Sequence, residues 1–242
     1  MIRNFFYILF VLSYLSHTST YAQVKHGDTV NFVSVYDSIY GIAVYDPLNF
    51  NIGGDSTRSD LKGYATQGWL QDYYKTGQVL HKGYYINGQL KAYKNFFPNG
   101  QVEREFKMTD LTKSAMTIFY QDGKPRSIIV YASSSVQKEE DYYPSGQLEY
   151  IEEYDRKCEY YLQRKFYNQE GKPTSVLEIT DPKKKNYSSK EYYDNGSIKE
   201  EGQIIYNGQL GDYHKNGKWK FYHENGLLKE VRFFSKSGEG KE

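Results

Sequence analysis

Short runs of alternating apolar and polar residues, each ended by a glycine-containing turn, cover most of the chain. The stretch FFPNGQVEREF at residues 96–106 shows the unit, with two aromatics, then Pro-Asn-Gly, then alternation. Close copies begin at Tyr73, Tyr84 and Tyr142. A period of two is typical of β-strands, and a turn of this type between two strands favours a hairpin because glycine accepts positive φ freely. The pattern predicts an all-β protein made of repeated hairpins.

The glycines that follow an aromatic recur at regular spacing, which indicates a repeat architecture. The gaps are 23, 23, 23, 25, 25 and 21 residues in the series Gly77, Gly100, Gly123, Gly146, Gly171, Gly196 and Gly217. A second series falls between them, with Gly68, Gly88, Gly208 and Gly226. One period then holds two strands and two turns on opposite edges, so we expect about fifteen strands in an elongated, twisted, single-sheet antiparallel meander. The glycines are interpreted as structural turn residues.

Loop lengths are predicted from the residues before each glycine. Pro98 fixes φ near −65°, which suits a type I turn, so Pro98-Asn99-Gly100 is expected to be a three-residue loop with Gly100 left-handed in a bulge. Residues 144–146 should match it. The copies at 167–171 and 222–226 hold one more residue after the aromatic and are expected to be four-residue loops.

The two ends of the chain depart from the repeat. Residues 68–234 form the predicted array, and residues 23–67 are interpreted as an N-terminal β cap that stops the edge strand from pairing with other chains. Residues 235–242 are polar and predict a frayed tail.

The first residues have the features of a secretory signal peptide. Arg3 precedes the apolar run at 5–15, and small residues follow up to Ala22. We expect cleavage after Ala22 and export across the inner membrane, to a periplasmic, cell-surface or secreted location. An uncleaved membrane anchor is the alternative, although the run is short for one.

Composition favours a thin sheet. The chain has 27 Tyr, 13 Phe and 2 Trp, and these residues suit pleated, half-exposed surfaces. Without Arg3, 30 basic and 30 acidic residues remain, so there is no overall field to attract nucleic acid or an anionic membrane. Cys158 is the single cysteine, which excludes an internal disulfide.

No residue pattern indicates catalysis. The histidines of the expected mature chain have no metal-ligand spacing, and His214 and His223 are expected at opposite edges of the sheet. Neighbouring acids such as Glu139-Glu140 and Glu152-Glu153 should alternate across the sheet and solubilise it. We expect no catalytic residue, no cofactor and no metal site, and we interpret the protein as non-enzymatic.

Two stretches are similar to a known repeat. GKWKFYHENGLLKEVRFF (217–234) and the sequence from Gly68 to Phe106 resemble the MORN-variant repeats of the YwqK-like antitoxin family. The motif Gly-x-Trp-x-x-aromatic-aromatic followed by Asn-Gly-x-Leu is matched by Gly217, Trp219, Tyr222, Asn225, Gly226 and Leu228. The resemblance covers about residues 63–234 and is strongest at both ends, since between Gly123 and Gly196 the tryptophan is missing. It implies a MORN-like array and an antitoxin-like or immunity-like role.

Because no residue pattern indicates catalysis, we expect the elongated sheet to act by binding through its surface. We expect a protein-interaction module whose partner is another protein, which the family resemblance suggests could be a toxin. The alternative is a cell-envelope glycan-binding protein that stacks sugars on exposed rings. Stable membrane contact is disfavoured by the neutral charge. The candidate binding surface consists of Trp69, Tyr74, Tyr85, Trp219 and Tyr222, for which packing on the neighbouring hairpin is the competing interpretation.

Overall fold

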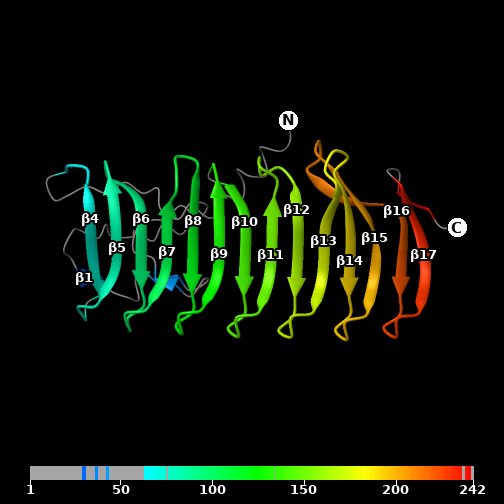
Figure 1. Ribbon diagram of the computed structural model, residues 1–242, viewed down its shortest axis with the longest axis horizontal. Coiled ribbons are helices and arrows are strands. Elements are labelled where there is room, and N and C mark those ends of the chain that lie inside the picture. Colours follow the sequence, from blue (N-terminus) through cyan, green and yellow to red (C-terminus); the bar gives the residue numbers. More distant parts are fainter. Residues whose placement is uncertain are drawn as a thin grey trace, which may run out of the picture.

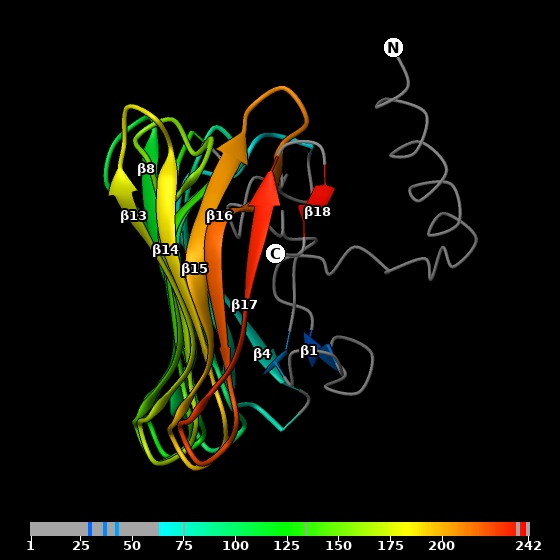
Figure 2. The same ribbon diagram turned by 90° about the vertical axis from the view of Figure 1, so that its right-hand side faces the viewer.

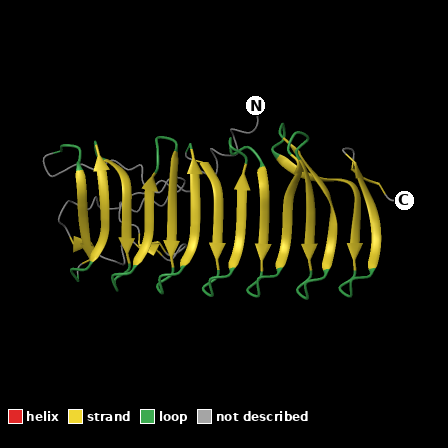
Figure 3. Cartoon of the chain, viewed as in Figure 1, coloured by secondary structure: helices red, strands yellow, loops and turns green. Residues whose placement is uncertain are grey.

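The computed structural model describes residues 63–74, 76–133, 135–235 and 238–240, and the backbone of three two-residue strands before them. These residues form strands and turns without any helix (Figure 1, Figure 3). The expected cap (23–67) lies largely outside the described residues, and the proposed signal peptide (1–22) lies entirely outside them.

One sheet contains nearly all the strands, and from β4 to β18 every neighbouring pair is antiparallel and consecutive in the chain. Fourteen of its strands form the repeat: β4 (Gly68–Tyr74), β5 (Val79–Ile86), β6 (Gln89–Phe96), β7 (Val102–Met108), β8 (Lys113–Phe119), β9 (Pro125–Ala132), β10 (Ser135–Tyr142), β11 (Leu148–Tyr154), β12 (Tyr161–Tyr167), β13 (Pro173–Asp181), β14 (Asn186–Tyr192), β15 (Ile198–Asn207), β16 (Asp212–Tyr222) and β17 (Leu228–Ser235). The predicted single-sheet meander is confirmed, with one strand fewer than the spacing suggested.

Short strands complete the two edges. β1 (Thr29–Val30) pairs parallel with β4, and β18 (Gly238–Gly240) pairs antiparallel with the end of β17. β2 (Tyr36–Asp37) and β3 (Ile42–Ala43) form a separate two-stranded sheet. Seen along its length, the main sheet is curved and twisted (Figure 2), which is expected for an open sheet of this size.

The turns at one edge, which we call the glycine edge, share one geometry. In the turn between β6 and β7, the amide of Gly100 donates to the carbonyl of Phe97 at 2.8 Å, and the amide of Phe97 donates to the carbonyl of Gln101 at 2.8 Å. Gly100 has φ +85°, so the predicted three-residue loop with a left-handed glycine is confirmed. The turn at Gly146 has the same bonds.

The two predicted four-residue loops are wrong. The amide of Asn168 donates to the carbonyl of Lys172, and that of His223 donates to the carbonyl of Leu227, so both turns are also three-residue loops. The reason is that Asn168 and His223 occupy the place that Phe97 has in the other copies. The turn needs a backbone amide and carbonyl at this place, which any residue except proline supplies.

The assignment of glycines to the two edges also needs correction. Gly226 lies in the glycine edge, between β16 and β17, together with Gly77, Gly100, Gly123, Gly146, Gly171 and Gly196. Gly88 and Gly208 lie in turns of the opposite edge, where Gly211 rather than Gly208 has a positive φ. Gly217 lies inside β16, not in a turn.

Gly217 has φ +68° at a bulge. Glu201 pairs with Lys220, and Gln203 pairs with Asn216, so residues 217–219 of β16 all lie opposite Gly202 of β15. A residue with positive φ allows the extra residues on β16 to be accommodated in a bulge, and glycine adopts that conformation without strain. The bulge brings Trp219 over Gly202.

Tyrosine hydroxyls connect successive hairpins along the glycine edge. The first residue of a turn is often a tyrosine, and its hydroxyl donates to a carbonyl at the end of a strand in the next hairpin. Three such bonds occur, from Tyr120 to Tyr142 (2.7 Å), from Tyr143 to Tyr167 (2.8 Å) and from Tyr193 to Tyr222 (2.8 Å).

The two faces of the sheet differ in composition. We call the inner face the one that carries, in one row of paired residues from β4 to β15, Leu70, Gly83, Tyr93, Phe106, Met116, Ile129, Glu139, Glu152, Arg164, Leu177, Ser189 and Gly202. The outer face carries lysines and glutamates in the neighbouring row, including the ion pairs Lys94–Glu105 (3.2 Å) and Lys220–Glu201 (3.1 Å). The core lies on the inner face between β4 and β9, where Tyr93, Phe106 and Tyr131 are each at most 2% exposed.

Candidate functional site

The inner face changes character at β10. Its central row is apolar and buried as far as Ile129 on β9, and the next members of the row are Glu139, Glu152 and Arg164. From β10 to β17 most inner-face side chains are only half-buried. The part of the inner face that offers side chains to a ligand therefore starts at β10.

A second row runs beside the central one, nearer to the glycine edge. It consists of Ser127, Asp141, Tyr150, Phe166, Ser175, Glu191, Glu200, Phe221 and Glu230. Apart from two serines, the side chains of this row are acidic or aromatic, and two of its carboxylates are paired with cations on β16 and β17. Together the two rows form the candidate binding face.

Two glutamates lie directly opposite each other at the start of this face. Glu139 of β10 pairs in register with Glu152 of β11, and Asp141 follows two positions along β10. Burial, together with the negative charges of Asp141 and Glu152, raises the pKa of Glu139 to about 7. Glu152 is 9% exposed and accepts a hydrogen bond of 2.5 Å from the hydroxyl of Tyr150.

An arginine stacks on the aromatic side chains next to these acids. The guanidinium carbon of Arg164 lies 5.2 Å from the ring centre of Tyr161 and 5.7 Å from that of Phe166. The rings of Tyr150 and Phe166 are 4.6 Å apart, and Phe166 is 37% exposed. These distances are typical of cation–π and aromatic contacts.

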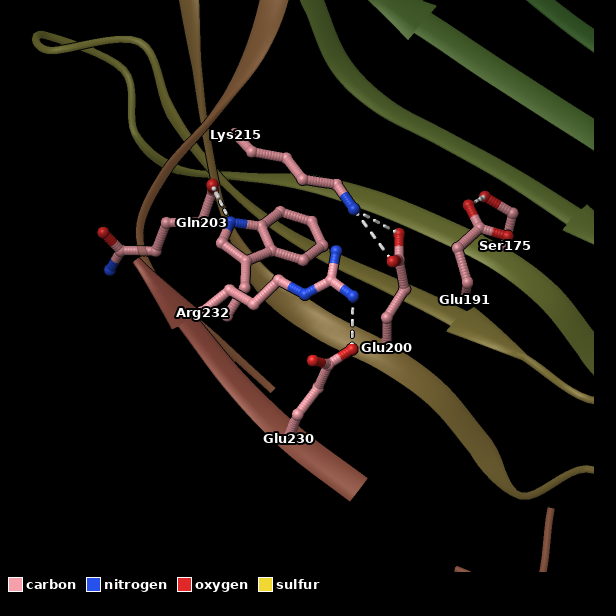
Figure 4. A network of polar contacts seen from close by, with 8 residues as sticks. Ser175, Glu191, Glu200, Gln203, Lys215, Glu230 and Arg232 are labelled. Atoms are coloured by element: carbon pink, nitrogen blue, oxygen red, sulfur yellow. Dashed lines mark hydrogen bonds and ion pairs between the residues drawn. The ribbon is translucent and has the colours of Figure 1, made fainter. Parts of the chain in front are cut away.

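A polar network closes the C-terminal part of the face (Figure 4). Lys215 bonds to both carboxylate oxygens of Glu200 at 2.8 Å, and Arg232 bonds to Glu230. The ammonium of Lys215 also lies 4.1 Å from the ring centre of Trp219. Both cations are therefore already paired with a carboxylate of the same face.

The residues predicted as a binding surface do not form one site. Tyr85 and Trp219 are both 0% exposed, so their expected roles in binding are wrong. Trp219 packs over Gly202, and its Nε1 donates to the carbonyl of Gln203 at 3.0 Å. Tyr222 is half-buried, with its hydroxyl bonded to Glu201 at 2.7 Å, and the side chain of Tyr74 lies outside the described residues.

Trp69 is the candidate that remains open to solvent. It is 62% exposed on the outer face at β4, and its ring centre lies 5.2 Å from that of Tyr84, which is 36% exposed. The ammonium of Lys82 lies 5.4 Å from the Trp69 ring centre. This small aromatic patch is far along the sheet from Trp219 (Figure 1).

Sequence reasoning missed the acids and the Tyr150–Phe166 pair. The acidic and aromatic residues are evident in the sequence, but the alternation along the strands predicts that Glu139 and Glu152 only solubilise the sheet. A register shift between Val136 and Lys138 puts Glu139 opposite Ile129 of β9, and the pairing of β10 with β11 puts it opposite Glu152. A bulge of this kind leaves no sequence signal apart from spacing.

No group of three or more His, Cys, Asp or Glu side chains among the described residues could hold a metal ion. A shallow open depression of about 420 Å³ on β12–β14 is lined by Leu162, Gln163, Glu178, Ile179, Thr180 and Ser188. Burial and the charge of Asp155 raise the pKa of the Cys158 thiol, which disfavours the reactive thiolate.

Within the described part of the chain, no helix is long and apolar enough to span a membrane.

Comparison with protein families gives one match. The model described as MORN repeat variant matches residues 138–156, 188–205 and 215–236. Each segment is one hairpin with its glycine-edge turn, namely β10–β11, β14–β15 and β16–β17. The chain thus contains MORN-variant repeats. One matched segment lies in the middle of the array, where the missing tryptophan had suggested a weaker likeness, and the stretch from Gly68 to Phe106 is not among the three.

A search of curated proteins gives no match to the sequence. Among solved structures, a mutant of S. aureus TarM in complex with Fondaparinux, alpha-GlcNAc-glycerol and UDP has a TM-score of 0.22 and 11% identity, over 52% of this chain and 19% of that chain. A second TarM structure has a TM-score of 0.23 and 13% identity over the same shares. A TcdB2-TccC3-Cdc42 structure has a TM-score of 0.19 and 8% identity, over 74% of this chain and 14% of that chain. Similarities this low carry no argument about fold or function.

Proposed function

We propose that this chain of MORN-variant repeats is a non-enzymatic module that binds another protein through its inner face between β10 and β17. The observation that carries the proposal is the change at β10, where a buried apolar row gives way to half-buried aromatic and charged side chains. Tyrosine, tryptophan and arginine are the residues that protein interfaces favour. An extended sheet of repeats also presents such residues in regular rows to a long partner.

Export and an immunity role are parts of this proposal that depend on the sequence. Residues 1–22 support secretion, and the resemblance to antitoxin repeats suggests that the partner is a toxin. The two fit together if the toxin acts outside the inner membrane. N-terminal sequencing of the protein isolated from its own cells tests export, because cleavage after Ala22 leaves Gln23 as the first residue.

Affinity capture from the envelope fraction of the host tests the binding role. The bait is the chain of residues 1–242 expressed with a C-terminal tag, and both proteins and sugars are analysed. We expect one protein in near-equal amount. Phe166→Ala on the inner face should lose it and Phe233→Ala on the outer face should keep it, since both rings are 37% exposed. Equal recovery with both variants would overturn the assignment of the face.

Glycan binding at the outer face is the second candidate, because Trp69 and Tyr84 are exposed and adjacent. Exposed aromatic rings of this kind can stack on sugar faces. In this case the capture recovers sugar without protein, and Trp69→Ala abolishes that recovery while Phe166→Ala does not. That outcome would replace protein recognition as the function.

A further inference from the structure

We propose that the start of the inner face, at β10 and β11, receives a basic segment of the partner, with a lysine or arginine side chain seated between Glu139, Asp141 and the Tyr150–Phe166 ring pair. The inference deepens the proposed function and rests on it for the partner being a protein. It names the chemistry of the partner's contacting residues.

The geometry supplies an acidic and aromatic block of two adjacent rows. In the central row, Glu139 is paired with Glu152. In the neighbouring row, Asp141 is paired with Tyr150, which is paired with Phe166. Directly opposite residues on one face have Cβ atoms about 4.5–5.5 Å apart. Carboxylates and aromatic faces within this range are the groups that attract ammonium and guanidinium ions.

Two acids of this block, Glu139 and Asp141, form no ion pair with a described residue. No Lys, Arg or His among the described residues forms an ion pair with Glu139 or Asp141, whereas Glu200 and Glu230 on the same face have Lys215 and Arg232. On β11 and β12, Glu152 accepts from Tyr150, and Arg164 is stacked on Tyr161 and Phe166. On β9, Ile129 faces Glu139 and brings no charge.

A buried hydroxyl beside the acids also lacks a partner. Ser127 of β9 is paired with Asp141, is 5% exposed, and its Oγ has no hydrogen-bond partner among the described residues. A buried polar atom without a partner costs free energy, and such atoms are rare. A donor N–H from a bound side chain next to Asp141 would satisfy it.

Like charges opposite each other on a half-buried face destabilise a sheet. The fold therefore bears a cost at Glu139 and Glu152 that a bound cation would offset. The same chain already places cations on aromatic rings three times on this face, with Arg164, Lys215 and Arg232. A cation from outside would extend this arrangement to Glu139 and Asp141 of β10, which form no ion pair with a described residue.

Binding of a cation favours the ionised form of Glu139. Because burial raises the pKa of this group to about 7, binding should release a proton near neutral pH. The affinity for a cationic ligand should accordingly rise as the pH increases from 6 to 8. The other charged groups that face this position are Asp141, Glu152 and Arg164.

The test measures binding of two short labelled peptides by fluorescence anisotropy to the full chain. One peptide alternates lysine and serine, and its matched control has glutamate in place of lysine. We expect binding of the lysine peptide, about tenfold tighter at pH 8 than at pH 6, and none of the glutamate peptide. Glu139→Gln should weaken binding at pH 8 by about tenfold and remove the pH dependence, and Asp141→Asn should weaken it similarly.

Glu140→Gln is the control, since Glu140 neighbours Glu139 on β10 but lies on the outer face in an ion pair with Lys138. A lysine peptide that does not bind, or that binds equally to wild type and Glu139→Gln, would overturn the inference. If Glu139→Gln retains the captured partner and Phe166→Ala loses it, the inference of a basic segment at Glu139 is contradicted, and the proposed binding through the inner face is kept. Loss of binding only with Glu140→Gln would place the cationic contact on the outer face and contradict the inference.

The folded state of the Glu139 variant is checked separately. The carboxyl has a higher pKa in the folded state than its usual 4.5, so ionisation is penalised in the folded state and stability is lost as the pH rises from about 4.5 to about 7. Glu139→Gln should therefore unfold at a higher denaturant concentration than wild type at pH 8, with little difference at pH 4. Lower stability at pH 8 would show that the side chain has a stabilising partner and would contradict the uncompensated charge.

Discussion

Single residues decide where the rings of this sheet can lie. Gly202 has an ordinary strand conformation, yet a Cβ there would lie closer than 3.0 Å to three ring atoms of Trp219. Gly83 is in the same position relative to Leu90 and Tyr85 at the other end of the sheet. Glycine at these places is required by the space that neighbouring side chains occupy, which is the Trp219 ring at Gly202 and His81, Leu90 and Tyr85 at Gly83, and not by backbone conformation.

Gly202→Ala tests this requirement. Because Trp219 is fully buried and its Nε1 is bonded to Gln203, the ring cannot move without losing contacts, and we expect a loss of about 2 kcal/mol in the free energy of unfolding. Gly208→Ala is the control, since the nearest atoms to its added Cβ are 3.7 Å away. Urea denaturation measures both, and equal effects would contradict the steric explanation.

At the scale of the element, each hairpin is held to its neighbours by pairing and by the tyrosine hydroxyls of the glycine edge. The bond from Tyr143 to the carbonyl of Tyr167 joins the turn after β10 to the end of β12. Where the turn begins with Phe97, Asn168 or His223, no tyrosine hydroxyl stands at this place. The three-residue turn therefore forms without the tyrosine hydrogen bond, which adds a link between hairpins where it is present.

Tyr143→Phe should cost about 1 kcal/mol, because it removes one hydrogen bond and keeps the ring. Tyr84→Phe, whose exposed hydroxyl has no hydrogen bond in the described structure, should change stability by less than about 0.5 kcal/mol. Thermal unfolding of the two variants and wild type is the measurement. A cost for Tyr84→Phe as large as that for Tyr143→Phe would show that the ring, not the bond, is responsible.

At the scale of the molecule, most contacts join neighbouring strands, and one cluster departs from this rule. The end of the β15–β16 hairpin bends over the inner face, so that the hydroxyl of Tyr213 accepts a 2.8 Å bond from the amide of Tyr161 on β12. The hydroxyl of Tyr206 donates to the carbonyl of Glu159 at 3.0 Å. Tyr187 of β14 also packs against Tyr213 with ring centres 5.3 Å apart. These bonds link the β15–β16 hairpin to β12 and the turn before it, across β13 and β14.

Tyr213→Phe should loosen this link without unfolding the sheet. The amide of Tyr161 loses its acceptor, so we expect its hydrogen exchange to become about tenfold faster, together with amides near the β15–β16 turn. Exchange in β4–β9 should stay the same, because a repeat array transmits little over several strands. Faster exchange throughout the sheet would show instead that the whole array unfolds as one unit.

The sequence by itself determined the all-β class, the hairpin repeat and the three-residue loops at Gly100 and Gly146, because these depend on local alternation and on the conformations that proline and glycine allow. It did not determine the position of Gly217, the loops at Gly171 and Gly226 or the burial of Tyr85 and Trp219. These features depend on β-bulges and on backbone hydrogen bonds in the turns, which residues of many types can form. Only the pairing of strands put Glu139 opposite Glu152 and beside Tyr150. Which face a side chain occupies changes with every one-residue shift in register, and that register is a property of the sheet as a whole.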